Sequence, residues 1–130
     1  MSRAVSITAK TFEATVDKEG IVILDWWAAW CGPCRVFAPI FEDAAGRYPD
    51  ITWGKVDTDA ESELSGAFGI QSIPTLMAFR DGILLFEQAG ALPGPALDRL
   101  VADIRALDMD DVRRRVAEER QNETPVQGVV

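Results

Sequence analysis

Cys31 and Cys34 are the residues of this sequence best suited to covalent chemistry. They are the only two cysteines among 130 residues, and Gly32 and Pro33 separate them in a Cys-x-x-Cys arrangement. A thiol at Cys31 can attack a disulfide of a partner, and Cys34 lies within reach to attack the mixed disulfide that results. Because the chain contains no histidine, Ser-His-Asp catalysis, Cys-His catalysis and His-ligated metal sites are excluded.

Three interpretations of the cysteine pair are open from its residues alone. A zinc site normally needs four ligands, so this chain would supply half of a four-thiolate site that bridges two chains. A structural disulfide would close so short a loop that it would constrain the unfolded chain little. A redox couple that alternates between dithiol and disulfide is the favoured interpretation.

The position of the pair in the sequence also favours reactivity. A nearly continuous apolar run from Ile21 to Trp27 precedes it, and a helical pattern follows it. Cys31 is therefore expected where a buried strand meets the beginning of a helix. Unpaired backbone N–H groups and the positive end of the helix dipole stabilise a thiolate there, so we expect the pKa of the Cys31 thiol to be lowered.

The elements that must position this pair alternate between strands and helices. Thr8 is expected to cap the first helix, Pro39 to kink the second, and Asp81-Gly82 to turn a hairpin. Parallel strands joined by helices come first and the hairpin comes last, which predicts an α/β fold with a central mixed sheet of five strands and about four flanking helices. The expected strands cover residues 5–7, 21–27, 51–56, 74–79 and 83–88, and the expected helices cover residues 9–18, 34–48, 60–67 and a closing segment defined by Leu97, Leu100, Val101 and Ile104.

Residues 108–130 stand apart from the domain predicted over residues 1–107. Val112 and Val116 lie in a thin apolar stripe among charged residues, so we expect a C-terminal extension made of a short helix and a flexible tail from Gln121 to Val130. In the simpler interpretation the helix docks on the domain through the two valines. The alternative is an element for a partner or for self-association.

Composition and charge limit the classes of function. The chain carries 21 acidic and 13 basic residues, a formal net charge of −8, which argues against nucleic-acid binding because phosphate recognition relies on clustered Lys and Arg. No apolar stretch near the N-terminus has the length of a signal peptide, and the strongest apolar run is interrupted by Asp25 and too short to cross a bilayer. We expect a soluble cytoplasmic protein that does not bind membranes.

The segments LDWWAAWCGPCRVFAP, KVDTD, SIPT and AGAL follow one another in this order. Together they resemble the thioredoxin family, and the resemblance covers residues 4–107. It implies the thioredoxin fold, with Cys31 as the attacking thiol and Cys34 as the resolving thiol of a redox-active disulfide. It also implies that Pro74 is a cis-proline beside the disulfide.

Asp25 matches the buried acid of the family, and its surroundings in the sequence agree. A carboxylate within an apolar strand is costly to bury, and desolvation would raise its pKa and let it accept a proton from Cys34. The alternative is an edge-strand aspartate that faces water. Lys55 matches the lysine that commonly lies near this acid, and its alternative is a solvated lysine at a strand end.

The resemblance further implies a flat, mostly apolar docking surface for an extended substrate peptide. Such a peptide could add main-chain hydrogen bonds beside Ile73, as in strand addition. Trp26 and Trp27 are instead expected to pack inside the protein. The residues expected to form the docking surface are Trp30, Gly32, Pro33, Ile73, Pro74, Ala89, Gly90 and Ala91.

The leading hypothesis is a thiol-disulfide oxidoreductase that reduces protein disulfides and acts as an electron carrier in cell redox homeostasis. Its expected electron donor is an NADPH-dependent thioredoxin reductase. The chain has no nucleotide-binding motif, so it is expected to bind no cofactor, and a monomer is expected. The alternatives are a disulfide isomerase or oxidase, which Gly32-Pro33 and the lack of histidine disfavour, and an interaction protein whose redox activity is vestigial.

Overall fold

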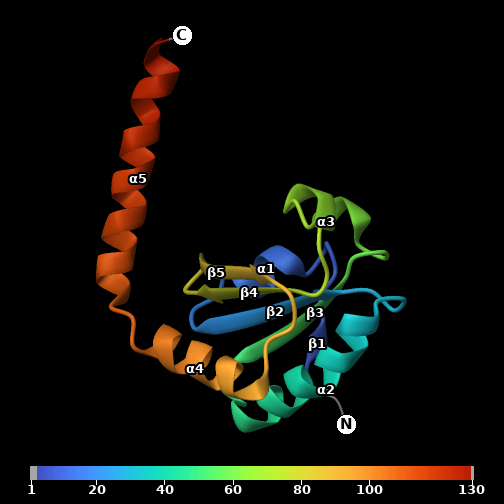
Figure 1. Cartoon of the computed structure of the whole chain (residues 1–130). Helices are drawn as coiled ribbons and strands as arrows, with labels where there is room; N and C mark the ends of the chain where they lie inside the picture. Colours follow the sequence, from blue (N-terminus) through green and yellow to red (C-terminus); the bar gives the residue numbers. More distant parts are fainter. Residues whose placement is uncertain (1–2, 130) are drawn as a thin grey trace.

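A five-stranded mixed sheet lies at the centre of the protein (Figure 1). The computed structural model describes residues 3–129, with side chains as far as Asn122. The strand order is β1-β3-β2-β4-β5, in which β1, β3 and β2 run parallel while β4 and β5 are each antiparallel to their neighbours. The strands are β1 (Val5–Ser6), β2 (Ile21–Trp27), β3 (Thr52–Asp57), β4 (Thr75–Arg80) and β5 (Ile83–Ala89). The predicted α/β fold class and the five-stranded mixed sheet are confirmed.

Helices cover both faces of this sheet. On one face, α1 (Phe12–Val16) and α3 (Ser62–Ala67) pack on a core that includes Val22, Leu24 and Trp26. On the other face, α2 (Gly32–Arg47) and α4 (Gly94–Arg105) pack on a core that includes Ile23. Figure 1 shows the sheet between these two pairs of helices.

The two cores follow from the alternation of side chains along β2. Successive residues of a strand point to opposite faces, so Val22 and Leu24 enter one core while Ile23 enters the other. Asp25 has the same parity as Ile23 and therefore points to the face that α2 covers. A carboxyl group is thus placed under the helix that carries the two cysteines.

The predicted helices 9–18, 34–48 and 60–67 differ from the structure at the start of all three and at the end of the first two. The first helix begins at Phe12 instead of residue 9, because Thr8 and Thr11 close a turn in which the Thr11 hydroxyl oxygen accepts a hydrogen bond from the Thr8 N–H at 3.0 Å. The second helix begins at Gly32 instead of Cys34, since Pro33 is compatible with the first helical turn. Cys34 is therefore already inside α2.

The C-terminal helix α5 (Met109–Val129) follows α4 after a connection over residues 106–108 and leaves the body of the domain (Figure 1). The Asp108 carboxylate accepts hydrogen bonds from the N–H groups of Asp110 and Asp111, which caps the first turn. The helix is continuous to Val129, whereas the sequence predicted a short helix and a flexible tail from Gln121. Among residues 3–129, no helix combines the length and the apolar character needed to cross a membrane.

The first turns of α5 are held by the β4–β5 hairpin. Asp81 and Gly82 have φ angles of 54° and 81°, as required at the centre of a tight hairpin turn. The Asp81 carboxylate accepts a hydrogen bond from the Gly20 N–H at 2.8 Å and forms an ion pair of 3.1 Å with Arg113 of α5. Met109 is buried, while Val112 and Val116 are only partly buried.

Candidate functional site

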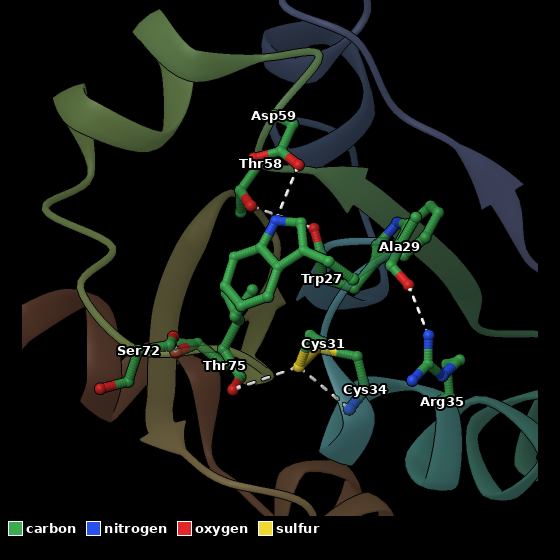
Figure 2. The surroundings of a disulfide bond; sticks show 11 residues. Trp27, Ala29, Cys31, Cys34, Arg35, Thr58, Asp59, Ser72 and Thr75 are labelled. Atoms are coloured by element: carbon green, nitrogen blue, oxygen red, sulfur yellow. Dashed lines mark hydrogen bonds between the residues drawn. A yellow bond between two sulfur atoms is a disulfide. The ribbon is translucent and has the colours of Figure 1, made fainter.

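The two cysteines form a disulfide at the N-terminus of α2 (Figure 2). Cys31 is the N-cap residue with extended backbone angles, and its sulfur accepts a hydrogen bond of 3.1 Å from the Cys34 N–H. The two Cα atoms are 5.2 Å apart, and each residue is 3% exposed. The N–H of Cys34 thus points at the sulfur of Cys31, where it can stabilise a thiolate once the disulfide is reduced.

The Ile73–Pro74 segment lies beside the disulfide, although it is some forty residues further along the chain. The peptide bond between the two residues is cis, as the resemblance implied. The carbonyl oxygen of Ile73 is 3.6 Å from the sulfur of Cys31, and the carbonyl oxygen of Pro74 accepts a hydrogen bond of 2.7 Å from the Gly90 N–H. In the part of the chain that the structure describes, no group accepts a hydrogen bond from the Ile73 N–H.

The residues expected to form the docking surface surround this disulfide in three segments of chain: the start of α2, the cis-proline segment and the end of β5. Trp30 is 67% exposed, and its indole N–H donates a hydrogen bond of 2.9 Å to Asp59. Gly32 and Ile73 are partly buried, and Pro74 is buried. The remaining members are exposed: Pro33, Ala89, Gly90 and Ala91.

Asp25 lies in a row of paired residues across three strands. It pairs with Lys55 on β3 and with Leu76 on β4, and all three side chains share the face that α2 covers. Asp25 is 0% exposed, and neither carboxyl oxygen has a hydrogen-bond partner among the described residues. Burial raises the pKa of Asp25 from 3.8 to about 7, against the opposing influence of the Lys55 charge.

Lys55 is not bonded to Asp25 but lies against an aromatic ring. Its ammonium nitrogen is 4.9 Å from the centroid of the Trp27 ring, within the range of a cation–π interaction. Trp27 in turn packs against the cluster of Ala28, Cys31 and Cys34. The prediction that Trp26 and Trp27 pack inside the protein is confirmed for the fully buried Trp26, but sequence reasoning missed the contact of Trp27 with Lys55. Residues 25 and 27 lie two apart on β2, so their side chains share a face, and this pattern could have placed Trp27 near the strand partner of Asp25.

Two further hydrogen bonds fix the loop between β2 and the disulfide (Figure 2). The Thr58 hydroxyl donates to the carbonyl oxygen of Trp27 at 3.1 Å, and the Arg35 guanidinium donates to that of Ala29 at 3.1 Å. The loop is thereby tied both to the end of β3 and to α2. Among the described residues, no cluster of three or more Cys, Asp or Glu side chains is arranged to hold a metal ion.

Known proteins share both the sequence and the fold. The Thioredoxin family model matches residues 3–105. A putative thioredoxin 2 of Streptomyces coelicolor is 49% identical over 120 residues, which are 92% of this chain and 90% of that protein, so the match reaches into the C-terminal extension. Thioredoxin of Bacillus subtilis is 39% identical over 98 residues, covering 75% of this chain and 93% of that protein.

Solved structures give the same result. The crystal structure of a thioredoxin of Malassezia sympodialis superimposes with a TM-score of 0.70 at 26% identity, covering 79% of this chain and 91% of that one. The chain belongs to the thioredoxin family of thiol-disulfide oxidoreductases.

Proposed function

We propose that this protein reduces disulfides of other proteins, with Cys31 as the attacking thiol and Cys34 as the resolving thiol. The observation that carries the proposal is the Cys31–Cys34 disulfide at the N-terminus of α2, beside the Ile73 carbonyl. The thiolate of reduced Cys31 attacks one sulfur of a substrate disulfide, and the other substrate sulfur leaves as a thiolate. The product of this step is a mixed disulfide between the substrate and Cys31.

The second step needs a thiolate at Cys34. Because Asp25 lies on the sheet face under α2 and has a pKa of about 7, it can accept the Cys34 proton near neutral pH. The Cys34 thiolate then attacks the sulfur of Cys31, the substrate leaves with both sulfurs reduced, and two electrons have passed to it. Lys55, paired with Asp25 across β2 and β3, is positioned to influence this proton transfer.

Substrate recognition is proposed to use the docking surface. An extended peptide beside Ile73 would find an unpaired N–H and a carbonyl, which are the groups that strand addition uses. The exposed members around it, such as Trp30 and Ala91, are mostly apolar and carry no pattern of charges. Such a surface can bind many partner sequences, because it contacts the substrate mainly through backbone hydrogen bonds and only weakly through its side chains.

Each turnover leaves the disulfide that the structure contains, so a donor of two electrons must restore the dithiol. We assign this role to an NADPH-dependent thioredoxin reductase, as expected for a member of this family. A monomeric electron carrier in the cytoplasm, where thiols are kept reduced, fits this cycle. Oxidation of NADPH by purified reductase in the presence of the oxidised protein tests the assignment.

Insulin reduction tests the proposed function directly. In the presence of dithiothreitol, the wild-type protein is expected to accelerate the precipitation of insulin, and Cys31→Ser is expected to abolish the acceleration. In a parallel reaction of pre-reduced protein without dithiothreitol, Cys34→Ser serves as the matched variant, because it should accumulate a mixed disulfide with insulin that Cys31→Ser cannot form. If the folded wild-type protein gives only the uncatalysed rate, the reductase proposal fails and the interaction-protein alternative leads.

A further inference from the structure

The contact between Trp27 and Lys55 determines how close a positive charge lies to Asp25. Lys55 is the Cα partner of Asp25, so its side chain starts next to the carboxyl group. Its ammonium nevertheless lies 4.9 Å from the centroid of the Trp27 ring, and both Asp25 oxygens lack hydrogen-bond partners within residues 3–129. Lys55 is the one cation that acts on Asp25 among the described residues, and it is held by an aromatic ring instead of by the carboxyl group.

Trp27 can hold Lys55 because of its place on β2. It is two residues after Asp25, so the two side chains point to the same face, and its own Cα partner on β3 is Asp57, two residues beyond Lys55. Lys55 therefore lies between two alternatives on β2, the carboxyl group beside it and the aromatic ring diagonal to it. Pairing with Asp25 would require the ammonium to lose water at a fully buried site, whereas the partly buried ring attracts it at lower cost.

Among the described residues, Lys55 is the only charged group that acts on Asp25. Arg80 shares the face at the far end of β4, where its guanidinium donates a hydrogen bond to the Ile104 carbonyl oxygen. Asp57 accepts hydrogen bonds from the N–H groups of Asp59 and Ala60 at the end of β3. The buried side chains that α2, β4 and α4 contribute to the core on this face are apolar, among them Phe37, Phe41, Leu76, Leu97 and Val101. The position of one ammonium group thus decides the local charge around the carboxyl group.

We propose that Trp27 is a positioning residue that holds the Lys55 ammonium over its ring and keeps it from pairing with Asp25, so that Asp25 stays able to accept a proton. The inference rests on the proposed function in assigning proton transfer to Asp25, but the charge competition exists whether or not the protein reduces insulin. Trp27 acts through Lys55 and touches no substrate in this role. Because Trp27 also packs against Cys31 and Cys34, its position connects the packing around the disulfide with the protonation of Asp25.

The test is a titration of the Asp25 carboxyl carbon by NMR in the oxidised protein, for wild type, Trp27→Leu, Lys55→Met and the double variant. Trp27→Leu is expected to lower the midpoint by about 1 pH unit, because the released ammonium can approach the carboxylate. Lys55→Met is expected to raise the midpoint. In the Lys55→Met background, Trp27→Leu is expected to cause no further fall.

A different result in this cycle overturns the proposal. If Trp27→Leu lowers the midpoint equally with and without Lys55, the ring only shields Asp25 from water, and if it changes nothing, the ring does not hold the cation. Should Trp27→Leu not fold, Trp27→Phe retains a weaker ring and is expected to give a smaller fall that also requires Lys55. Insulin reduction, measured in parallel, reports separately whether the proposed function fails.

Discussion

Replacement of Asp25 by asparagine is expected to remove most of the pH dependence that this buried carboxyl group imposes on unfolding. In the folded protein the pKa of Asp25 is about 7, while in the unfolded chain the group returns to its ordinary value of 3.8. Below pH 3.8 the group is protonated in both states and contributes no pH dependence. Between the two values the unfolded chain loses its proton first, so the free energy of unfolding falls as the pH rises.

The size of the effect follows from the difference between the two pKa values. Each pKa unit corresponds to about 1.4 kcal/mol, so the contribution of Asp25 to the free energy of unfolding declines by about 1.4 kcal/mol per pH unit between pH 5 and pH 6.5. From pH 4 to pH 8 the decline amounts to about 3 to 4 kcal/mol and then levels off. This is a large part of the stability of an ordinary small domain.

Denaturant unfolding of the oxidised protein at several pH values measures this contribution. The free energy of unfolding of Asp25→Asn minus that of wild type is expected to increase steadily between pH 4 and pH 7. Val56→Ala is the matched control, because it removes buried volume without removing an ionisable group, and its difference from wild type should stay constant. A difference for Asp25→Asn that is equally flat would refute the argument that burial without a partner controls this carboxyl group.

Three further predictions concern parts of the structure outside the disulfide. Gly54→Ala is expected to lower the free energy of unfolding by about 1–3 kcal/mol, because the added methyl would lie 2.7 Å from a carbon of Ile7. The control is Gly46→Ala on α2, whose added methyl meets nothing within 4 Å and should not destabilise the protein. Denaturant midpoints of the two variants compare the effects. Asp98→Asn should lower the Tm at pH 7 but not near pH 2. The Arg47 guanidinium bonded to Asp98 holds the pKa of that carboxyl below its ordinary value. The stability that this pair contributes is therefore lost as the pH falls through the lowered pKa. Deletion of residues 109–130 should leave the kcat of insulin reduction within about twofold of wild type, because α5 begins at the opposite end of the sheet from the disulfide (Figure 1). A tenfold loss of kcat in a folded protein would show that α5 takes part in turnover.

Much of the fold could be predicted because its signals are local. The apolar run of β2, the helical spacing after Cys34 and the Asp81-Gly82 turn each depend on residues close together in the chain. The boundaries were less accurate where a competing hydrogen bond decided them, as between Thr8 and Thr11. A sequence pattern shows which residues suit a helix, but it does not show at which residue a competing local hydrogen bond delays its start.

The sequence by itself determined that the two cysteines lie where a buried strand is followed by a helix, because the apolar run before them and the helical spacing after them are both local patterns. It also determined, through side-chain parity, that Asp25 faces the same core as Ile23. Only the tertiary structure decided that Ile73 meets the sulfur of Cys31 and that Lys55 lies on Trp27 instead of on Asp25. Periodicity assigns a side chain to a face, whereas its partners there depend on how strands and helices distant in sequence pack together, and that packing decides the electrostatic surroundings of the acid.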